Sequence, residues 1–225
     1  MKRTSTNGNG DTMNEQITKC ESLVKEIYNN MDASHDFPHL ERVYENALTI
    51  LQAEPGANEK IVRLAVLLHD VSDSKYADSK EDEDRILQAL DLTADEIKHI
   101  QTVIAEVSFN GGNELPATTI ESKIVRDADR LDAIGAVGIA RTFAYGGAKG
   151  RKLYDDAEEA RANMSVEDYR AKSTASVTHF YEKLLLLKDL MVTEKGQELA
   201  EARHAFMVQF LDQLKKERDG ISWVI

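Results

Sequence analysis

The sequence predicts an all-α protein, and three observations carry this prediction. Apolar residues recur at spacings of three and four through most of the chain after residue 13. Only three prolines and twelve glycines interrupt the 225 residues, which favours helices because these two residue types are the least helical. No segment shows the sustained alternation of apolar and polar residues that is typical of a half-buried strand.

The first half of the chain divides into a tail and five helices. Residues 1–12 are polar and contain no apolar core of a secretory signal, so we expect a disordered tail there. Pro55-Gly56 ends the second helix clearly, and Thr93 with Glu96 has the spacing of a capping box at the start of the fifth. The five helices are expected over residues 14–30, 39–53, 58–71, 84–91 and 94–107.

The second half contains three more helices and one glycine-rich break. A helix is expected over 119–133, and the small-residue segment 134–141 continues it or packs directly after it. The stretch 145–150, with three glycines, has the composition of a flexible loop or a mobile flap. Two long helices, over 166–190 and 194–217, finish what we interpret as a single domain from residue 13 to residue 225.

Charge and composition exclude several classes of protein. The net charge of -12 argues against a protein that follows a nucleic-acid polymer, because neutralising phosphates requires clustered lysine and arginine. A single cysteine, Cys20, cannot form an internal disulfide and fits a reducing compartment. No apolar run approaches the roughly 20 residues of a membrane span. We therefore expect a cytoplasmic protein without a membrane or nucleic-acid partner, either a monomer or a homodimer.

The pair His69-Asp70 closes an apolar run, Leu64 to Leu68, and is the most informative feature of the chain. A helix that is apolar nearly all round belongs in a core, where two ionisable side chains are costly unless something compensates them. Imidazole nitrogens and carboxylate oxygens are both good ligands for divalent transition metals. This pair therefore predicts a metal site at the end of the third helix.

Other histidines and aspartates extend this pattern. His35 and His39 lie four residues apart and share a helix face if both are helical, and Asp129 and Asp132 share another. The residues alone do not decide between His35 and His39 as the first ligand. Two imidazoles and two carboxylates from three helices would leave metal positions for water and substrate, as in a catalytic site. Asp127 and Asp132 are better explained as structural residues that bind helix ends or arginine side chains.

Three segments carry a resemblance to a known family: Ser34-His-Asp-Phe-Pro-His39, His69-Asp-Val-Ser-Asp-Ser-Lys-Tyr76 and Asp127-Ala-Asp-Arg-Leu-Asp-Ala-Ile-Gly-Ala-Val-Gly-Ile-Ala-Arg141. The chain resembles the HD superfamily of metal-dependent phosphohydrolases, and in particular a branch of small bacterial and eukaryotic HD proteins with nucleotide pyrophosphohydrolase-like members. The resemblance implies an HD-domain helical bundle with additional C-terminal helices. It also implies hydrolysis of (deoxy)nucleoside triphosphates to a monophosphate and pyrophosphate.

The resemblance also implies roles for individual residues. It favours His39 over His35 as the first ligand, because an apolar residue, Val43, follows His39 by four positions. One divalent ion is expected, with Mn²⁺ ahead of Mg²⁺, Co²⁺, Fe²⁺ and Zn²⁺. The implied metal ligands are His39, His69, Asp70 and Asp129. The implied catalytic residues are Asp70 and Asp73, with Asp73 as a candidate general base. The candidate contacts to substrate phosphate are His35, Lys75, Arg130, Arg141 and Lys149.

One position departs from the family pattern. Many relatives have a histidine before Ser-Phe where this chain has Val107, and a valine cannot bind a metal or a phosphate. We therefore expect a site with one metal ion. Two alternatives remain open: a 5′-nucleotidase-like phosphomonoesterase, and a non-catalytic domain that binds a nucleotide and regulates a partner.

Overall fold

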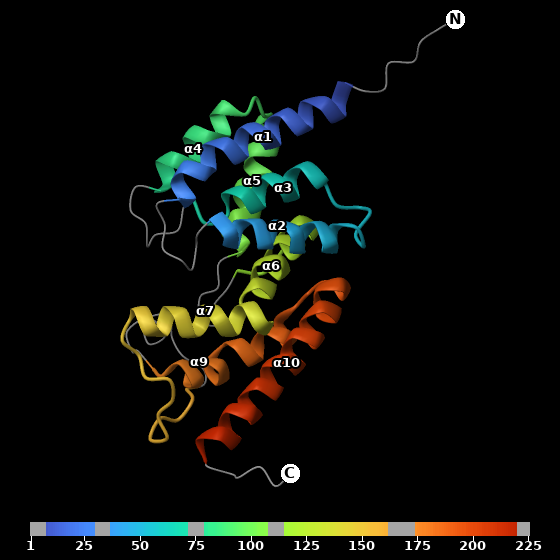
Figure 1. Cartoon of the computed structure of the whole chain (residues 1–225). Helices are drawn as coiled ribbons and strands as arrows, with labels where there is room; N and C mark the ends of the chain where they lie inside the picture. The colour runs from blue at the N-terminus through green and yellow to red at the C-terminus, as the bar shows by residue number, and fades with distance from the viewer. Residues whose placement is uncertain (1–7, 30–36, 72–78, 108–114, 162–173, 220–225) are drawn as a thin grey trace, which may run out of the picture. The chain divides into compact units, whose positions relative to one another are not determined.

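The all-α prediction is confirmed. The computed structural model describes residues 8–29, 37–71, 79–107, 115–161 and 174–219, and these residues contain helices and no strand (Figure 1). They form two compact units. Unit 1 comprises the described residues up to 107 together with 115–126, unit 2 comprises the described residues from 127 onward, and the boundary falls inside one helix. The division into two units does not test the predicted single domain over 13–225, which stays a prediction.

Unit 1 is built around a buried central helix, α3. This helix packs against α1, α2 and α5, and Figure 1 shows it between α1 and α2. Seven of its ten residues are buried, as its apolar sequence requires, and Asn58 caps its start by accepting a hydrogen bond from the Ile61 N–H. The helices of unit 1 are α1 (Gly8–Tyr28), α2 (Phe37–Leu51), α3 (Glu59–Leu68), α4 (Ser79–Ala89), α5 (Ala94–Val107) and the first part of α6 (Ile120–Asp132).

Local signals in unit 1 place most helix ends within a few residues. The predicted capping box is present, because the Thr93 N–H donates to Glu96 Oε2 at 2.9 Å and the Glu96 N–H donates to Thr93 Oγ1 at 3.2 Å. The start of α1 differs from the expectation. Residues 8–12, assigned to the tail from sequence, belong to this helix, and Asp11 lies in its first turn, where a negative charge favours a helix.

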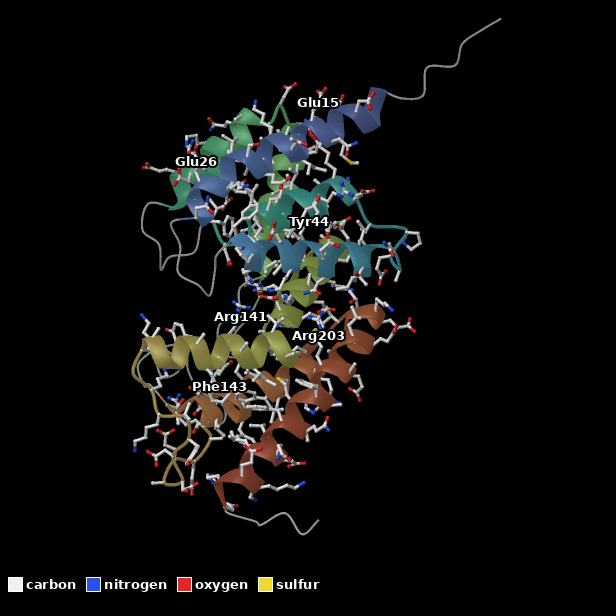
Figure 2. The ribbon with its side chains drawn as sticks, in the orientation of Figure 1. Glu15, Glu26, Tyr44, Arg141, Phe143 and Arg203 are labelled. Carbon is white, nitrogen blue, oxygen red and sulfur yellow. The ribbon has the colours of Figure 1, made fainter. Side chains whose placement is uncertain are left out.

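Unit 2 contains the rest of α6 and four further elements. The helix α10 packs against both α7 and η1. Three aromatic rings, Phe143, Phe180 and Phe210, lie 5.8–6.2 Å apart between centroids, and Phe143 is labelled on α7 in Figure 2. The elements are α7 (Gly135–Ala148), α9 (Ser176–Glu182), the 3₁₀ helix η1 (Leu184–Leu190) and α10 (Glu194–Arg218), which the sequence predicted to within one residue.

Two predictions in unit 2 are wrong. The expected flexible stretch 145–150 is mostly helical, since α7 continues to Ala148 and Gly146 packs directly on Ser176. In the described part of the expected helix over 166–190, the helix begins at Ser176, is interrupted at Lys183, where φ is −139°, and continues as η1. Residues 166–173 lie outside the described residues. A 3₁₀ helix has three residues per turn. This period places Leu184 and Leu187 in the core and leaves Leu186 52% exposed.

Two glycines of α7, Gly138 and Gly147, provide a matched test of how closely the start of this helix packs against the residues before it. A Cβ on Gly138 would lie 2.2 Å from the carbonyl oxygen of Ala133, whereas nothing lies within 4 Å of a Cβ on Gly147. We expect Gly138→Ala to lower the free energy of unfolding by about 1–3 kcal/mol through overpacking. Gly147→Ala should raise it by up to about 1 kcal/mol through helix propensity. Urea unfolding checks both, and equal effects would contradict the close approach at Gly138.

Candidate metal centre

The end of α3 presents His69 with a defined orientation. The His69 side chain is 1% exposed, and its Nδ1 lies 2.8 Å from the carbonyl oxygen of Val66. A carbonyl oxygen only accepts hydrogen bonds, so Nδ1 carries a proton, and in the neutral ring Nε2 then presents its lone pair. A histidine that binds a metal through one ring nitrogen is usually oriented by such a hydrogen bond from the other ring nitrogen.

His39, on α2, meets His69 and Asp70 in the interior of unit 1. Asp70 Oδ2 lies 3.3 Å from His39 Nε2 and 3.3 Å from His69 Nε2, and the two imidazole centroids are 5.7 Å apart. All three candidate ligand atoms lie within 4.8 Å of one another. We call these three residues the His–Asp cluster. The structure thus brings together three of the four predicted metal ligands.

The chemistry of the His–Asp cluster fits a divalent metal better than a set of ion pairs. Two protonated imidazoles at this separation would repel each other, and burial would disfavour both charges. Two neutral imidazoles and one carboxylate are a suitable ligand set for Mn²⁺, Fe²⁺, Co²⁺ or Zn²⁺. Asp70 is 14% exposed, whereas the histidine side chains are 1–2% exposed. The cluster therefore meets solvent on the side of Asp70.

Several predicted site residues stay predictions. Asp129 lies on the part of α6 that belongs to unit 2, and its role as the fourth ligand is not tested by the geometry of unit 1. His35, Asp73 and Lys75 lie outside the described residues. Val107, at the position where relatives often have histidine, is 3% exposed.

The predicted phosphate-binding cations of unit 2 have intramolecular contacts. Arg130 donates to the carbonyl oxygen of Leu190, and Arg141 donates to Asp132 Oδ2 at 2.6 Å. Arg141 is labelled in Figure 2. The ammonium group of Lys149 lies 5.6 Å from the centroid of the Tyr145 ring. Roles of these three cations in substrate binding stay predictions.

The structural roles predicted for Asp127 and Asp132 are confirmed. Asp127 accepts hydrogen bonds at the start of α10, and Asp132 pairs with Arg141. Sequence reasoning did not assign Arg203, which donates to the carbonyl oxygen of Leu131 near the end of α6. The close approach of Arg203 to Gly135, where φ is +75°, explains why a glycine follows α6. None of the described helices has the length and apolar character needed to span a membrane.

Comparisons with known proteins identify the family. The HD domain family matches residues 37–134, which include the whole His–Asp cluster. The chain is 39% identical over 216 residues to the uncharacterized protein YpgQ of Bacillus subtilis (strain 168), covering 92% of this chain and 96% of that protein.

Solved structures agree with this match. The crystal structure of an HD-superfamily hydrolase from Bacillus thuringiensis is 42% identical with a TM-score of 0.72, covering 92% of this chain and 98% of that chain. Bacillus subtilis YpgQ in complex with ADP is 34% identical with a TM-score of 0.73, covering 92% and 96%. The chain therefore belongs to the HD superfamily of hydrolases.

Proposed function

We propose that this protein is a metal-dependent phosphohydrolase that converts (deoxy)nucleoside triphosphates to monophosphates and pyrophosphate. The observation that carries the proposal is the His–Asp cluster, in which two buried imidazoles converge on one oxygen of Asp70 at 3.3 Å each. The crystal structure of YpgQ in complex with ADP supports a nucleotide as the substrate. The proposed ion is Mn²⁺. Two imidazole ligands disfavour Mg²⁺, and Fe²⁺, Co²⁺ and Zn²⁺ also suit this ligand set.

Each residue of the His–Asp cluster has a defined task in this proposal. A divalent ion held by these residues would lower the pKa of a coordinated water from 15.7 to about 7 in favourable cases and would polarise a phosphoryl oxygen. His69 is held in one tautomer by Val66, so its Nε2 is ready to coordinate without reorienting. Asp70 contributes the negative charge of the ligand set on the side that meets solvent, where a phosphate ester can approach. His39 completes the set from α2.

Residues beyond the cluster complete the proposed site. Asp129 is the proposed fourth ligand, and Asp73 is the proposed base that accepts a proton from the attacking water. Cations near the developing charge on phosphorus stabilise it during the reaction. The proposed phosphate contacts are His35, Lys75, Arg130, Arg141 and Lys149.

The products of hydrolysis test this proposal directly. The chain is incubated with Mn²⁺ and a panel of ribo- and deoxyribonucleoside mono-, di- and triphosphates, and the products are identified by mass. We expect a monophosphate and pyrophosphate from triphosphates, with loss of turnover in excess EDTA. Orthophosphate released from monophosphates would instead assign a nucleotidase. Tight nucleotide binding without turnover in Mn²⁺ would assign a regulatory domain.

A further inference from the structure

Six residues of unit 2 form a second group of interest, which we call the Arg151 cluster. Tyr145 and Lys149 lie at the end of α7, Ser176 and His179 lie three residues apart on α9, and Lys183 directly follows that helix. The guanidinium of Arg151 lies 5.1 Å from the centroid of the Tyr145 ring. The cluster consists of Tyr145, Lys149, Arg151, Ser176, His179 and Lys183.

The ends of α7 and α9 are held together by backbone contacts. The Arg151 N–H donates to the carbonyl oxygen of Gly146 at 2.8 Å, and the Ser176 N–H donates to the carbonyl oxygen of Lys152 at 3.0 Å. A Cβ on Gly146 would lie 2.2 Å from Ser176 Oγ and 3.7 Å from Arg151 Cβ. Ser176 and Arg151 are therefore neighbours, although 25 positions separate them in the sequence.

Two polar groups of the cluster lack a partner. Ser176 is 1% exposed, and its Oγ has no hydrogen-bond partner in the part of the chain that the structure describes. The buried Nε of Arg151 likewise has none there, and Arg151 forms no ion pair with a described carboxylate. Buried donors are nearly always satisfied in folded proteins. Two unsatisfied donors on neighbouring residues therefore leave a place for an acceptor from outside the chain.

Two cations near Arg151 in the sequence, Lys152 and Arg161, form ion pairs with carboxylates, and Arg151 differs from them in this respect. Lys152 is 71% exposed and lies 2.6 Å from Asp155 Oδ2. Arg161 Nε lies 2.7 Å from Glu182 Oε1. Each of these two cations therefore has a carboxylate partner, whereas the contact that the described residues give the Arg151 guanidinium is with the Tyr145 ring.

The electrostatics of the cluster favour an anion. Burial, with the positive charges of Lys183 and Arg151, lowers the pKa of His179 to about 3. The imidazole is therefore neutral at pH 7 and adds no charge of its own. Glu182 also faces this histidine and acts on its pKa in the opposite direction. The whole chain carries a net charge of -12, so the gathering of Lys149, Arg151 and Lys183 at the ends of α7 and α9 departs from its average charge.

We propose that the Arg151 cluster is a phosphate-binding site, in which Arg151 and Ser176 donate hydrogen bonds to phosphate oxygens. The forked guanidinium matches phosphate geometry, and its stacking on Tyr145 fixes it before the ligand arrives. Lys149 and Lys183 add charge around the anion. Anion binding follows from unit 2 alone, whereas the choice of a nucleotide or pyrophosphate as the ligand rests on the function proposed above.

Calorimetry on the full chain tests this site without the metal. The protein is treated with EDTA and titrated separately with pyrophosphate, orthophosphate and ADP, and the tightest of these identifies the source of the phosphate. We expect the wild type to bind pyrophosphate or ADP. Arg151→Gln should weaken that binding roughly tenfold to a hundredfold, as loss of a hydrogen bond to a charged group does. Lys152→Gln, the matched control, should weaken it by less than about threefold.

A second variant separates charge from geometry. Arg151→Lys keeps the positive charge but loses the fork, and we expect affinity between those of wild type and Arg151→Gln. Thermal unfolding and circular dichroism monitor the folding of every variant. The site is refuted if the metal-free wild type binds none of the three anions, or if Arg151→Gln and Lys152→Gln weaken binding equally.

The two proposals fail in distinguishable ways. If the wild type binds pyrophosphate through Arg151 but hydrolyses no nucleotide with Mn²⁺, the anion site stands and the proposed reaction falls. If nucleotides are hydrolysed and the metal-free protein binds no phosphate, the reaction stands and the Arg151 cluster is not a phosphate site.

Discussion

Replacing Asp70 with asparagine is expected to reduce both Mn²⁺ affinity and nucleotide turnover by more than about a hundredfold. Loss of a residue that only orients a metal ligand already costs about 10- to 100-fold, and Asp70 is the one carboxylate at the centre of the His–Asp cluster. The amide keeps the size of the side chain and removes its negative charge. The measurements are metal content after dialysis and kcat on the best nucleotide of the panel.

Asp212→Asn is the control for this prediction. Asp212 is exposed on α10, and its replacement changes the net charge by the same amount. It should leave metal content and turnover unchanged. If Asp70→Asn retained stoichiometric Mn²⁺ and normal turnover while folding as the wild type does, the His–Asp cluster would not be the metal centre.

The helices of unit 1 could be predicted because their signals are local. The apolar run before His69 requires burial on nearly all sides, and Thr93 and Glu96 specify the start of α5 within four residues. The errors in unit 2 have a nonlocal origin. Glycines at 146 and 147 favour a loop on composition, but Ser176 packs against Gly146 and makes a side chain there unsuitable. The local sequence around Gly146 does not indicate that Ser176, thirty residues away, packs against it.

The candidate site was predictable to the extent that its residues are adjacent or belong to a recognisable motif. His69 and Asp70 are neighbours in the chain, and a ligand atom of His39, the first ligand that the resemblance favours, lies within 4.8 Å of theirs. The donors of the Arg151 cluster were not found, except Lys149. Arg151 and Ser176 come together only because α9 returns to the end of α7. Neither residue belongs to a motif with a spacing that suggests chemistry.

Asp127 makes a helix-end interaction with residues that lie far from it in the sequence. Its carboxylate is fully buried and accepts hydrogen bonds from the N–H groups of Val192 and Thr193 and from Thr193 Oγ1, the last two at 2.7 Å. Thr193 in turn caps α10 by accepting from the Gly196 N–H at 3.0 Å. One side chain on α6 therefore fixes the start of a 25-residue helix.

Asp127→Ala is expected to lower the free energy of unfolding by about 3–5 kcal/mol. The substitution leaves the N–H groups of Val192 and Thr193 and the hydroxyl of Thr193 without their acceptor, and each unsatisfied buried donor costs about 1–3 kcal/mol. Asp127→Asn keeps one acceptor oxygen and should lose less. Urea unfolding at pH 7 measures both, with Asp212→Asn as the surface control. A loss below about 1 kcal/mol for the alanine variant would contradict this role.

The ionisation of Asp127 makes a second, pH-dependent contribution. Burial raises its pKa above the ordinary value of 3.8, and the hydrogen bonds from Thr193 and Val192 only partly offset that effect. The folded protein therefore binds this proton more tightly than the unfolded chain does. The resulting stability is present below pH 3.8 and is lost as the pH rises through the raised pKa.

Asparagine at this position does not titrate, which isolates the effect of the proton. The stability of the wild type minus that of Asp127→Asn should fall as the pH rises from 3.8 and become constant above the raised pKa. The pKa of Glu182 is shifted in the opposite direction. Burial alone would raise its pKa, but hydrogen bonds from Arg161 and Thr174 outweigh burial and lower it. A difference that rose with pH would mean that the hydrogen bonds at the start of α10 outweigh the burial of Asp127 as well.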